Sequence, residues 1–276
     1  MTHGPGPVAR AALVGALVAA LLPTLALGAP PAAASSSTTA PRPRTLTVSA
    51  ASSLTDVMGR IARRFERSHP GVRVRLNLGS SATLARQIAN GAPADVLATA
   101  SESSWSDAAI AGRVRPSGRG TWFARNRLVV AVRRDGPIRL RTVRDVRRAR
   151  ILAMCVRSAP CGGLGEVLLR RAEVSFPESS ITRAADARAT LAALTRGDAD
   201  AAIVYRSDAV AAGARVRYLD VGNHDNVEDL SVYSIAPTVD AADPALARAF
   251  VAAVRSDWAL RLLLDAGFMR PPGGRR

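Results

Sequence analysis

The sequence predicts an α/β fold with mostly parallel sheets. From residue 45 onward, short runs suited to strands alternate with stretches of helical spacing. Gly91, Gly112 and Gly197 lie where helix C-caps are expected. A length of 276 residues with 48% hydrophobic content suits one large or two medium domains and excludes a mainly disordered chain. Such sheets bind ligands beyond the carboxyl ends of their strands.

The expected elements follow from residue periodicity. The first two strands alternate apolar and polar residues, and the others are short apolar runs. We expect strands at 45–50, 72–78, 95–100, 127–133, 150–156 and 200–205. We expect helices at 53–68, 81–90, 103–111, 163–172, 186–196 and 244–264.

The N-terminus has the layout of a secretory signal. His3 and Arg10 precede an uncharged apolar run, residues 11–29, which Pro23 interrupts. An uncleaved membrane anchor is the alternative, because the run approaches the length needed to span a bilayer. Pro23 and the Ala-rich stretch that follows favour cleavage, so we expect an exported protein.

Cleavage after Ala34 satisfies the small-x-small rule together with Ala32. Residues 1–34 are therefore the expected signal peptide, and residues 35–44, "SSSTTAPRPR", a flexible linker. No Cys lies near the end of the apolar run, which excludes lipid attachment at that point.

The 2 cysteines, Cys155 and Cys161, are candidates for a disulfide. An exported protein with an even cysteine count favours the bond. Two free thiols are the alternative, and the spacing fits neither a CxxC redox motif nor a zinc site.

The net charge of +16 does not by itself indicate a nucleic-acid partner. All 38 basic residues are Arg, which suggests coding bias. The densest Arg run, residues 124–151, lacks interleaved stacking aromatics, and the whole chain holds only 4% aromatic residues. We expect a solvated basic face and no nucleic-acid partner.

Small and hydroxyl residues recur where strands give way to helices. "TVSAASSLTDVMGRIARRF" places Ser53 at such a junction, and "LNLGSSATLARQI" places Ser81 at the next. "VRSAPCGGLGEVLL" and "ITRAADARATLAAL" repeat the arrangement. A helix start holds an anion through unpaired N–H groups, and small residues let the ligand approach. Helix capping is the alternative for each junction, and Ser53 with Asp56 fits a capping box.

Several segments together resemble the periplasmic molybdate-binding proteins (the ModA family), the receptors of molybdate ABC transporters. These segments are "SAASSLTDVM", "GSSATLARQIANGAPADVLATA", "APCGG" and "IVYRSDA", and the resemblance covers roughly residues 45–270. It implies a type II periplasmic binding protein fold, with two lobes and a central ligand cleft that holds molybdate or tungstate.

The resemblance implies five ligand-binding residues. Ser53 and Ser81 would offer hydroxyls and amides, Cys161 and Ala187 backbone amides, and Tyr205 a phenolic hydroxyl. A dianion without a dissociable proton is best met by donors alone, because a facing acceptor would go unpaired. Neutral donors also avoid burying a cation in the empty cleft.

The resemblance also implies the organisation of the lobes and the partners. Lobe one would comprise residues 45–124 and 231–276, and lobe two residues 125–230, with crossings near "TWFARNR" and "EDLSVYS". We expect a monomer without a cofactor that delivers its ion to the transporter permease and thereby its ATPase. Its location would be the periplasm or the outer face of the cytoplasmic membrane.

Three other interpretations stay open at this point. An enzyme is disfavoured, because none of the 3 His residues belongs to a recognisable nucleophile or metal motif. A receptor of the same fold for another oxyanion, such as sulfate, is the second. The third is an Arg-rich envelope or nucleic-acid-binding protein, whose binding would fall strongly with added salt.

Overall fold

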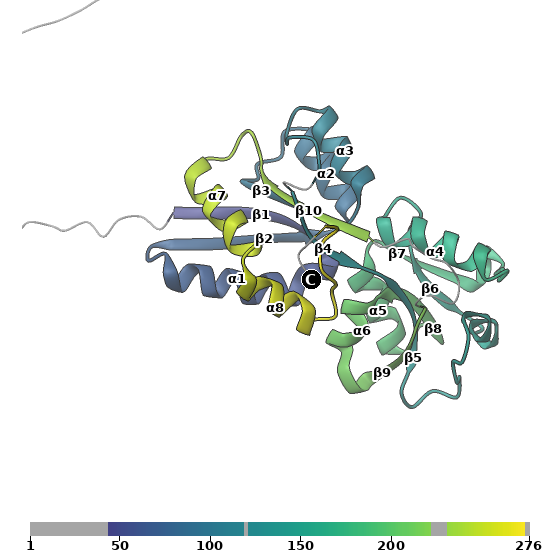
Figure 1. Ribbon diagram of the computed structural model, residues 1–276. Helices are drawn as coiled ribbons and strands as arrows, with labels where there is room; N and C mark the ends of the chain where they lie inside the picture. Colours follow the sequence, from purple (N-terminus) through teal and green to yellow (C-terminus); the bar gives the residue numbers. More distant parts are fainter. Residues whose placement is uncertain (1–43, 119–120, 222–230, 274–276) are drawn as a thin grey trace, which may run out of the picture. The chain divides into compact units, whose positions relative to one another are not determined.

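The computed structural model of the protein describes residues 44–118, 121–221 and 231–273 (Figure 1). These residues form an α/β fold with two five-stranded sheets, in the strand orders β2-β1-β3-β10-β4 and β7-β6-β8-β5-β9. The predicted signal peptide, and the predicted linker except for Arg44, lie outside the described residues. Within them, no helix has the length and apolar character needed to cross a membrane.

The first sheet is covered by helices on both faces (Figure 1). Its strands are β1 (Arg44–Ala51), β2 (Val72–Gly79), β3 (Val96–Thr99), β10 (Ser231–Pro237) and β4 (Trp122–Asn126). Val96 and Ala98 share one core with α1 (Thr55–Ser68), α7 (Pro244–Val254) and α8 (Asp257–Asp265). Leu97, which points the other way, packs with α2 (Ser81–Ala89) and α3 (Glu102–Ile110).

The second sheet is layered in the same way. Its strands are β5 (Leu128–Arg133), β6 (Leu152–Cys155), β7 (Ile181–Ala184), β8 (Ala201–Tyr205) and β9 (Val216–Asp220). Ile203 belongs to the core that holds α4 (Pro160–Arg171). Its neighbours Ala202 and Val204 face α5 (Ala187–Arg196) and α6 (Arg206–Ala212). The α/β class and the two-lobed architecture predicted from the sequence are confirmed.

Both sheets are mixed, so the expectation of mostly parallel sheets was wrong. β1 pairs in parallel with β2 and β3, and β6 pairs in parallel with β7 and β8. β10 and β5, the strands beside the passages between the sheets, pair antiparallel with both neighbours. The chain enters β5 and β10 after it crosses from the other sheet, so each of these strands runs opposite to the parallel strands of its own sheet.

The chain passes from one sheet to the other at Arg127. β4 ends at Asn126 in the first sheet, and β5 begins at Leu128 in the second. The return lies between β9 and β10, where residues 222–230 are outside the described part of the chain. The domain limits predicted from the sequence, after residues 124 and 230, stay predictions.

Other expected elements differ in detail. The helix expected at 244–264 is two helices, because the Ser256 hydroxyl caps α8 by accepting a hydrogen bond from the Ala259 N–H. Helix α6 (Arg206–Ala212) and the strands β4, β7, β9 and β10 were not predicted from the sequence. Arg residues within several of these short runs weaken the apolar signal on which the prediction depended.

The first turn of α4 requires a glycine at one position. A Cβ at Gly162 would lie 2.0 Å from the Val156 carbonyl oxygen, and the neighbouring backbone cannot move aside cheaply. At Gly163, the next residue, a Cβ would meet nothing closer than 3.7 Å. The close approach at Gly162 lets the chain fold back from β6 into α4.

Forcing an extra carbon into a packed site costs about 1–3 kcal/mol of stability. For a protein of this size, we therefore expect Gly162→Ala to lower the melting temperature by roughly 2–10 °C. Gly163→Ala is the matched control and should melt at or slightly above the native temperature, because Ala is the better helix former. Thermal unfolding followed by circular dichroism measures both. Equal melting temperatures for the two variants would contradict the assigned crowding.

Candidate functional site

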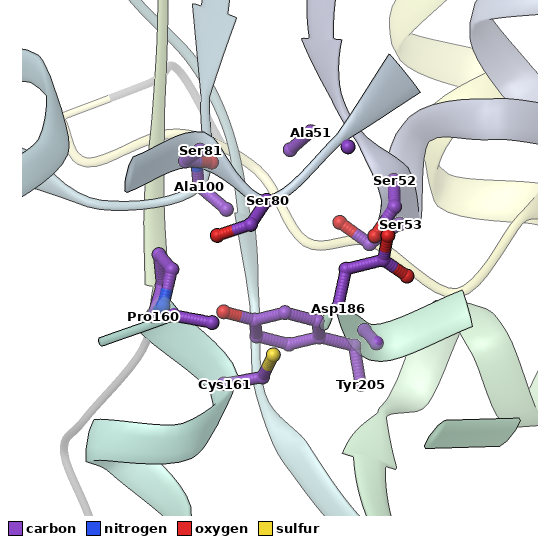
Figure 2. A pocket seen from close by; sticks show the side chains of 13 residues that line it. Ala51, Ser52, Ser53, Ser80, Ser81, Ala100, Pro160, Cys161, Asp186 and Tyr205 are labelled. Carbon is purple, nitrogen blue, oxygen red and sulfur yellow. The ribbon is translucent and has the colours of Figure 1, made fainter. Parts of the chain in front are cut away.

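The starts of four helices and one tyrosine surround a single small pocket (Figure 2). The pocket is small, and short side chains and backbone make up most of its lining. All five residues predicted to bind the ligand line this pocket. Its lining consists of Ala51, Ser52, Ser53, Gly79, Ser80, Ser81, Ala100, Ala159, Pro160, Cys161, Asp186, Ala187 and Tyr205.

The position of the pocket follows from the topology. Ser53 and Ser81 follow the carboxyl ends of the parallel strands β1 and β2, and Cys161 and Ala187 follow β6 and β7. Tyr205 is the last residue of β8. The chain thus brings the carboxyl ends of both sheets to one place, as expected for ligand sites of this fold class.

Three of the four helix starts at the pocket lack a side-chain cap, and α5 is the exception. No side chain caps α2 or α4, or the 3₁₀ turn Ser52–Leu54 that leads into α1. In contrast, side chains of Ser101, Asp243 and Ser256 cap α3, α7 and α8, which start elsewhere. First-turn N–H groups without a capping side chain, together with the helix dipole, favour an anion.

This pattern decides against simple capping for two serines. Ser53 does not cap α1, and its hydroxyl instead contacts the Tyr233 hydroxyl at 2.7 Å. The Ser81 Oγ accepts a hydrogen bond of 2.9 Å from the Ala100 N–H. Since that lone pair is occupied, the Ser81 hydroxyl keeps its own hydrogen for a further acceptor, and the residue lines the pocket.

Tyr205 supplies a third hydroxyl. Its ring is buried, and its OH lies 2.9 Å from the Ser231 Oγ. Burial raises the pKa of the Tyr205 phenol above its ordinary range, so the group stays protonated and can donate.

Cys161 and Ala187 lie in the first turns of α4 and α5. Cys161 forms a disulfide with Cys155, with the two Cα atoms 5.8 Å apart. The bond ties the end of β6 to the start of α4, and the Cys161 sulfur carries no proton to donate. The polar hydrogen that Cys161 can offer is therefore on its backbone nitrogen, as it is for Ala187.

Asp186 is a pocket residue that the sequence analysis missed. Its carboxylate caps α5 by accepting a 3.0 Å hydrogen bond from the Ala189 N–H. The expectation of a lining made of donors alone was thus wrong at one position. An Asp three residues before a helix-forming Ala, in "DARA", is a capping signal that could have placed this carboxylate.

An arginine beside the pocket is paired with a carboxylate. Arg188, on α5, contacts Asp56, on α1, at 2.7 Å and so joins the two sheets' helices beside the pocket. Among the described residues that line the pocket, none is an Arg or His. Any anion held there is held by neutral hydrogen-bond donors.

The Arg-rich run does not contribute to the pocket. Arg127 pairs with Asp220, Arg144 with Glu173 and Arg148 with Asp145. Exposed pairs of this kind contribute little stability and leave a solvated surface. Within the described residues, no group of three or more His, Cys, Asp or Glu residues could hold a metal ion.

Asp208 is a buried carboxyl that contacts the backbone of the pocket residue Tyr205. Its Oδ2 accepts a 3.3 Å hydrogen bond from the Tyr205 N–H at the start of α6. Burial raises its pKa from 3.8 to about 7, Arg188 and the Tyr205 N–H oppose this shift, and Asp186 and Asp56 add to it. The carboxyl therefore holds a proton across the mildly acidic range.

Two lobes that enclose a small pocket at the carboxyl ends of their strands define a class of ligand-binding protein. Residues 46–269 match the family described as bacterial extracellular solute-binding proteins. The chain belongs to this family and, within it, to the molybdate-binding (ModA) proteins.

Relatives and solved structures agree with this membership. The molybdate-binding protein of Mycobacterium tuberculosis is 32% identical over 83% of this chain and 85% of its own. The molybdate-binding protein of Escherichia coli is 32% identical over 81% of this chain and 88% of its own. The structure of the Azotobacter vinelandii periplasmic molybdate-binding protein, 21% identical, aligns with a TM-score of 0.72 over 82% of this chain and 99% of its own. The structure of the sulfate-binding protein SubI of M. tuberculosis, 20% identical, aligns with a TM-score of 0.70 over 83% of this chain and 88% of its own.

Asp208 makes stability depend on pH. The folded protein keeps a proton that the unfolded chain releases between pH 3.8 and about 7, so this group's contribution to stability falls as pH rises through that window. Asn cannot ionise and still accepts from the Tyr205 N–H. We expect Asp208→Asn to melt above the native protein at pH 8, with the difference shrinking toward pH 4.

Differential scanning calorimetry across that pH range measures the effect. Asp107→Asn, at an exposed position on α3, is the control and should give a small, nearly constant difference. If the melting temperatures of Asp208→Asn and the native protein differ by the same amount at pH 4 and pH 8, a buried carboxylate is ruled out as the cause of that difference.

Proposed function

We propose that this protein captures molybdate or tungstate between its two lobes and delivers the ion to an ABC transporter. The observation that carries the proposal is the convergence of helix starts without side-chain caps, with hydroxyls from Ser53, Ser81 and Tyr205, on one small pocket. Neutral donors fixed by the backbone match a dianion that has no proton of its own.

Burial strengthens such a site. Ser53, Ser81 and Tyr205 are all buried, as are Cys161 and Ala187. Hydrogen bonds in a dry pocket act through a lower local dielectric than in water, so each contributes more to binding the ion. The two lobes supply donors from opposite sides, and an ion between them stabilises the arrangement in which they meet.

Export and the transporter complete the proposal. The relative from M. tuberculosis is a molybdate-binding protein, and one from Bacillus subtilis is a putative ABC transporter substrate-binding lipoprotein, 27% identical over 84% of this chain. We infer that residues 1–34 direct export and are removed. The protein then acts as a monomer, without a cofactor or enzymatic activity, and presents its ion to the permease and thus to the ATPase of the transporter.

Another oxyanion, in place of molybdate or tungstate, is the alternative ligand. The Asp186 carboxylate in the lining can accept a hydrogen bond from a ligand that carries a proton, such as hydrogen phosphate. The likeness to the fold of a sulfate-binding protein adds sulfate to the candidates. Size also separates them, because sulfate is smaller than molybdate.

Isothermal titration of the purified protein with molybdate, tungstate, sulfate and phosphate, each at two salt concentrations, tests the proposal. We expect tight one-to-one binding of molybdate and tungstate, weak binding of the other two, and little change with salt because the site is buried. Tighter binding of sulfate or phosphate than of molybdate would mean that one of those two anions is the ligand of this receptor. No heat with any of the four would refute the oxyanion receptor, and salt-sensitive binding of nucleic acid would point to the Arg-rich surface.

Single hydroxyl deletions locate the site. Ser53→Ala and Ser81→Ala should each weaken molybdate binding by about 1–3 kcal/mol, the scale for losing a hydrogen bond to a charged group. Ser179→Ala, at an exposed position on the second lobe, is the matched control and should bind as the native protein does. Unchanged affinity in both pocket variants, measured by the same titration, would place the ion elsewhere.

A further inference from the structure

A chain of buried polar side chains lies behind Ser53. The Ser53 Oγ is 2.7 Å from the Tyr233 hydroxyl, which is 3.4 Å from the Asn126 Nδ2. The same Nδ2 donates to the Ser207 Oγ at 2.8 Å. Asn126 and Tyr233 are fully buried, so their polar atoms depend on these partners.

The orientation of the Asn126 amide is fixed by the backbone. Its Oδ1 accepts a 3.0 Å hydrogen bond from the Arg127 N–H. Because a backbone N–H must meet an acceptor, the amide oxygen lies on that side, and the amide nitrogen faces Tyr233 and Ser207. An amide nitrogen donates and cannot accept.

The direction of the Tyr233 proton follows. Its hydroxyl contacts Asn126 Nδ2 and Ser53 Oγ, and only the serine oxygen can accept. A buried hydroxyl costs free energy when its hydrogen has no acceptor, so the proton points to Ser53. Burial also raises the pKa of the Tyr233 phenol well above its ordinary value, which keeps the proton in place.

We propose that Tyr233, oriented by Asn126, forces the Ser53 hydroxyl to act as a donor toward the bound oxyanion. Ser53 accepts from Tyr233 on one side, so its own hydrogen is directed away from Tyr233, and Ser53 lines the pocket. The Ala100 N–H occupies the Ser81 oxygen in the same way. Tyr233 is a positioning residue in this proposal, which rests on the oxyanion-binding function proposed above.

The consequence is specificity as well as affinity. A serine hydroxyl free to rotate can donate to a fully deprotonated anion or accept from a protonated one. With one lone pair taken by Tyr233 and its hydrogen directed to the pocket, Ser53 donates more readily than it accepts, which favours molybdate over hydrogen phosphate. Without the Tyr233 hydroxyl, Ser53 can turn its hydrogen away and accept more readily, so the difference in affinity between the two anions narrows.

The test uses Tyr233→Phe, which keeps the ring and its edge-on contacts with Phe123, Tyr205 and Phe268. The full chain is titrated with molybdate and with phosphate, as the native protein, as each single variant with Tyr233→Phe or Ser53→Ala, and as the double variant. Tyr218→Phe, at a partly exposed tyrosine of β9, is the matched control.

We expect Tyr233→Phe to weaken molybdate binding about 2- to 10-fold, the range that one hydrogen bond contributes. The preference for molybdate over phosphate should fall with it. In the Ser53→Ala background, Tyr233→Phe should change the affinity by less than about twofold, because the residue acts through Ser53. Tyr218→Phe should change neither affinity nor preference.

If Tyr233→Phe weakens molybdate binding equally in the native and the Ser53→Ala backgrounds, or in neither, the positioning role is overturned while the receptor function stays in place. If the native protein binds none of the oxyanions, the proposed function fails and this inference with it. Should Tyr233→Phe melt far below the native protein, Asn126→Asp replaces it. This variant puts an accepting carboxylate oxygen where the amide nitrogen donated, so the Tyr233 proton can turn from Ser53. An unchanged preference for molybdate would then overturn the proposal.

Discussion

The structure depends on backbone N–H groups at helix starts that no side chain caps. A helix leaves its first amides without intrahelical partners, and a buried amide without a partner costs free energy. Here the starts of α1, α2 and α4 meet beside α5 at one pocket, where small residues such as Ala51, Gly79 and Ala100 leave the backbone accessible. An anion would satisfy several such amides at once, so the feature that weakens the empty fold is the one that the proposed function uses.

The side chains around the pocket add direction to this attraction. Helix dipoles attract any anion, but hydroxyls can both donate and accept, and their preference depends on what lies behind them. The Ala100 N–H occupies the Ser81 oxygen, and the Tyr233 hydroxyl contacts the Ser53 oxygen. Asp186 is the exception, because its carboxylate faces the pocket while it caps α5. In the proposed function, the balance between these groups decides which oxyanion is favoured.

The strong positive charge of the chain has little to do with this pocket. Arginines such as Arg127, between the two sheets, and Arg144 are paired with carboxylates, and the described pocket lining contains no cationic side chain. Arg188 approaches the site, but Asp56 neutralises it in a contact between α5 and α1. A site built from neutral donors can release its ion, because no buried cation is left behind when the ion departs.

The sequence by itself determined the α/β class, the family and the strand-to-helix junctions that carry Ser53, Ser81, Cys161, Ala187 and Tyr205. These are local signals, since small and hydroxyl residues between a strand and a helix have a local conformational cause. Only the tertiary structure decided that the junctions meet at one pocket, that β5 and β10 run antiparallel, and that Asn126 and Tyr233 stand behind Ser53. Asn126 and Tyr233 are 107 residues apart in the chain, and no local pattern encodes a contact made by sheet pairing.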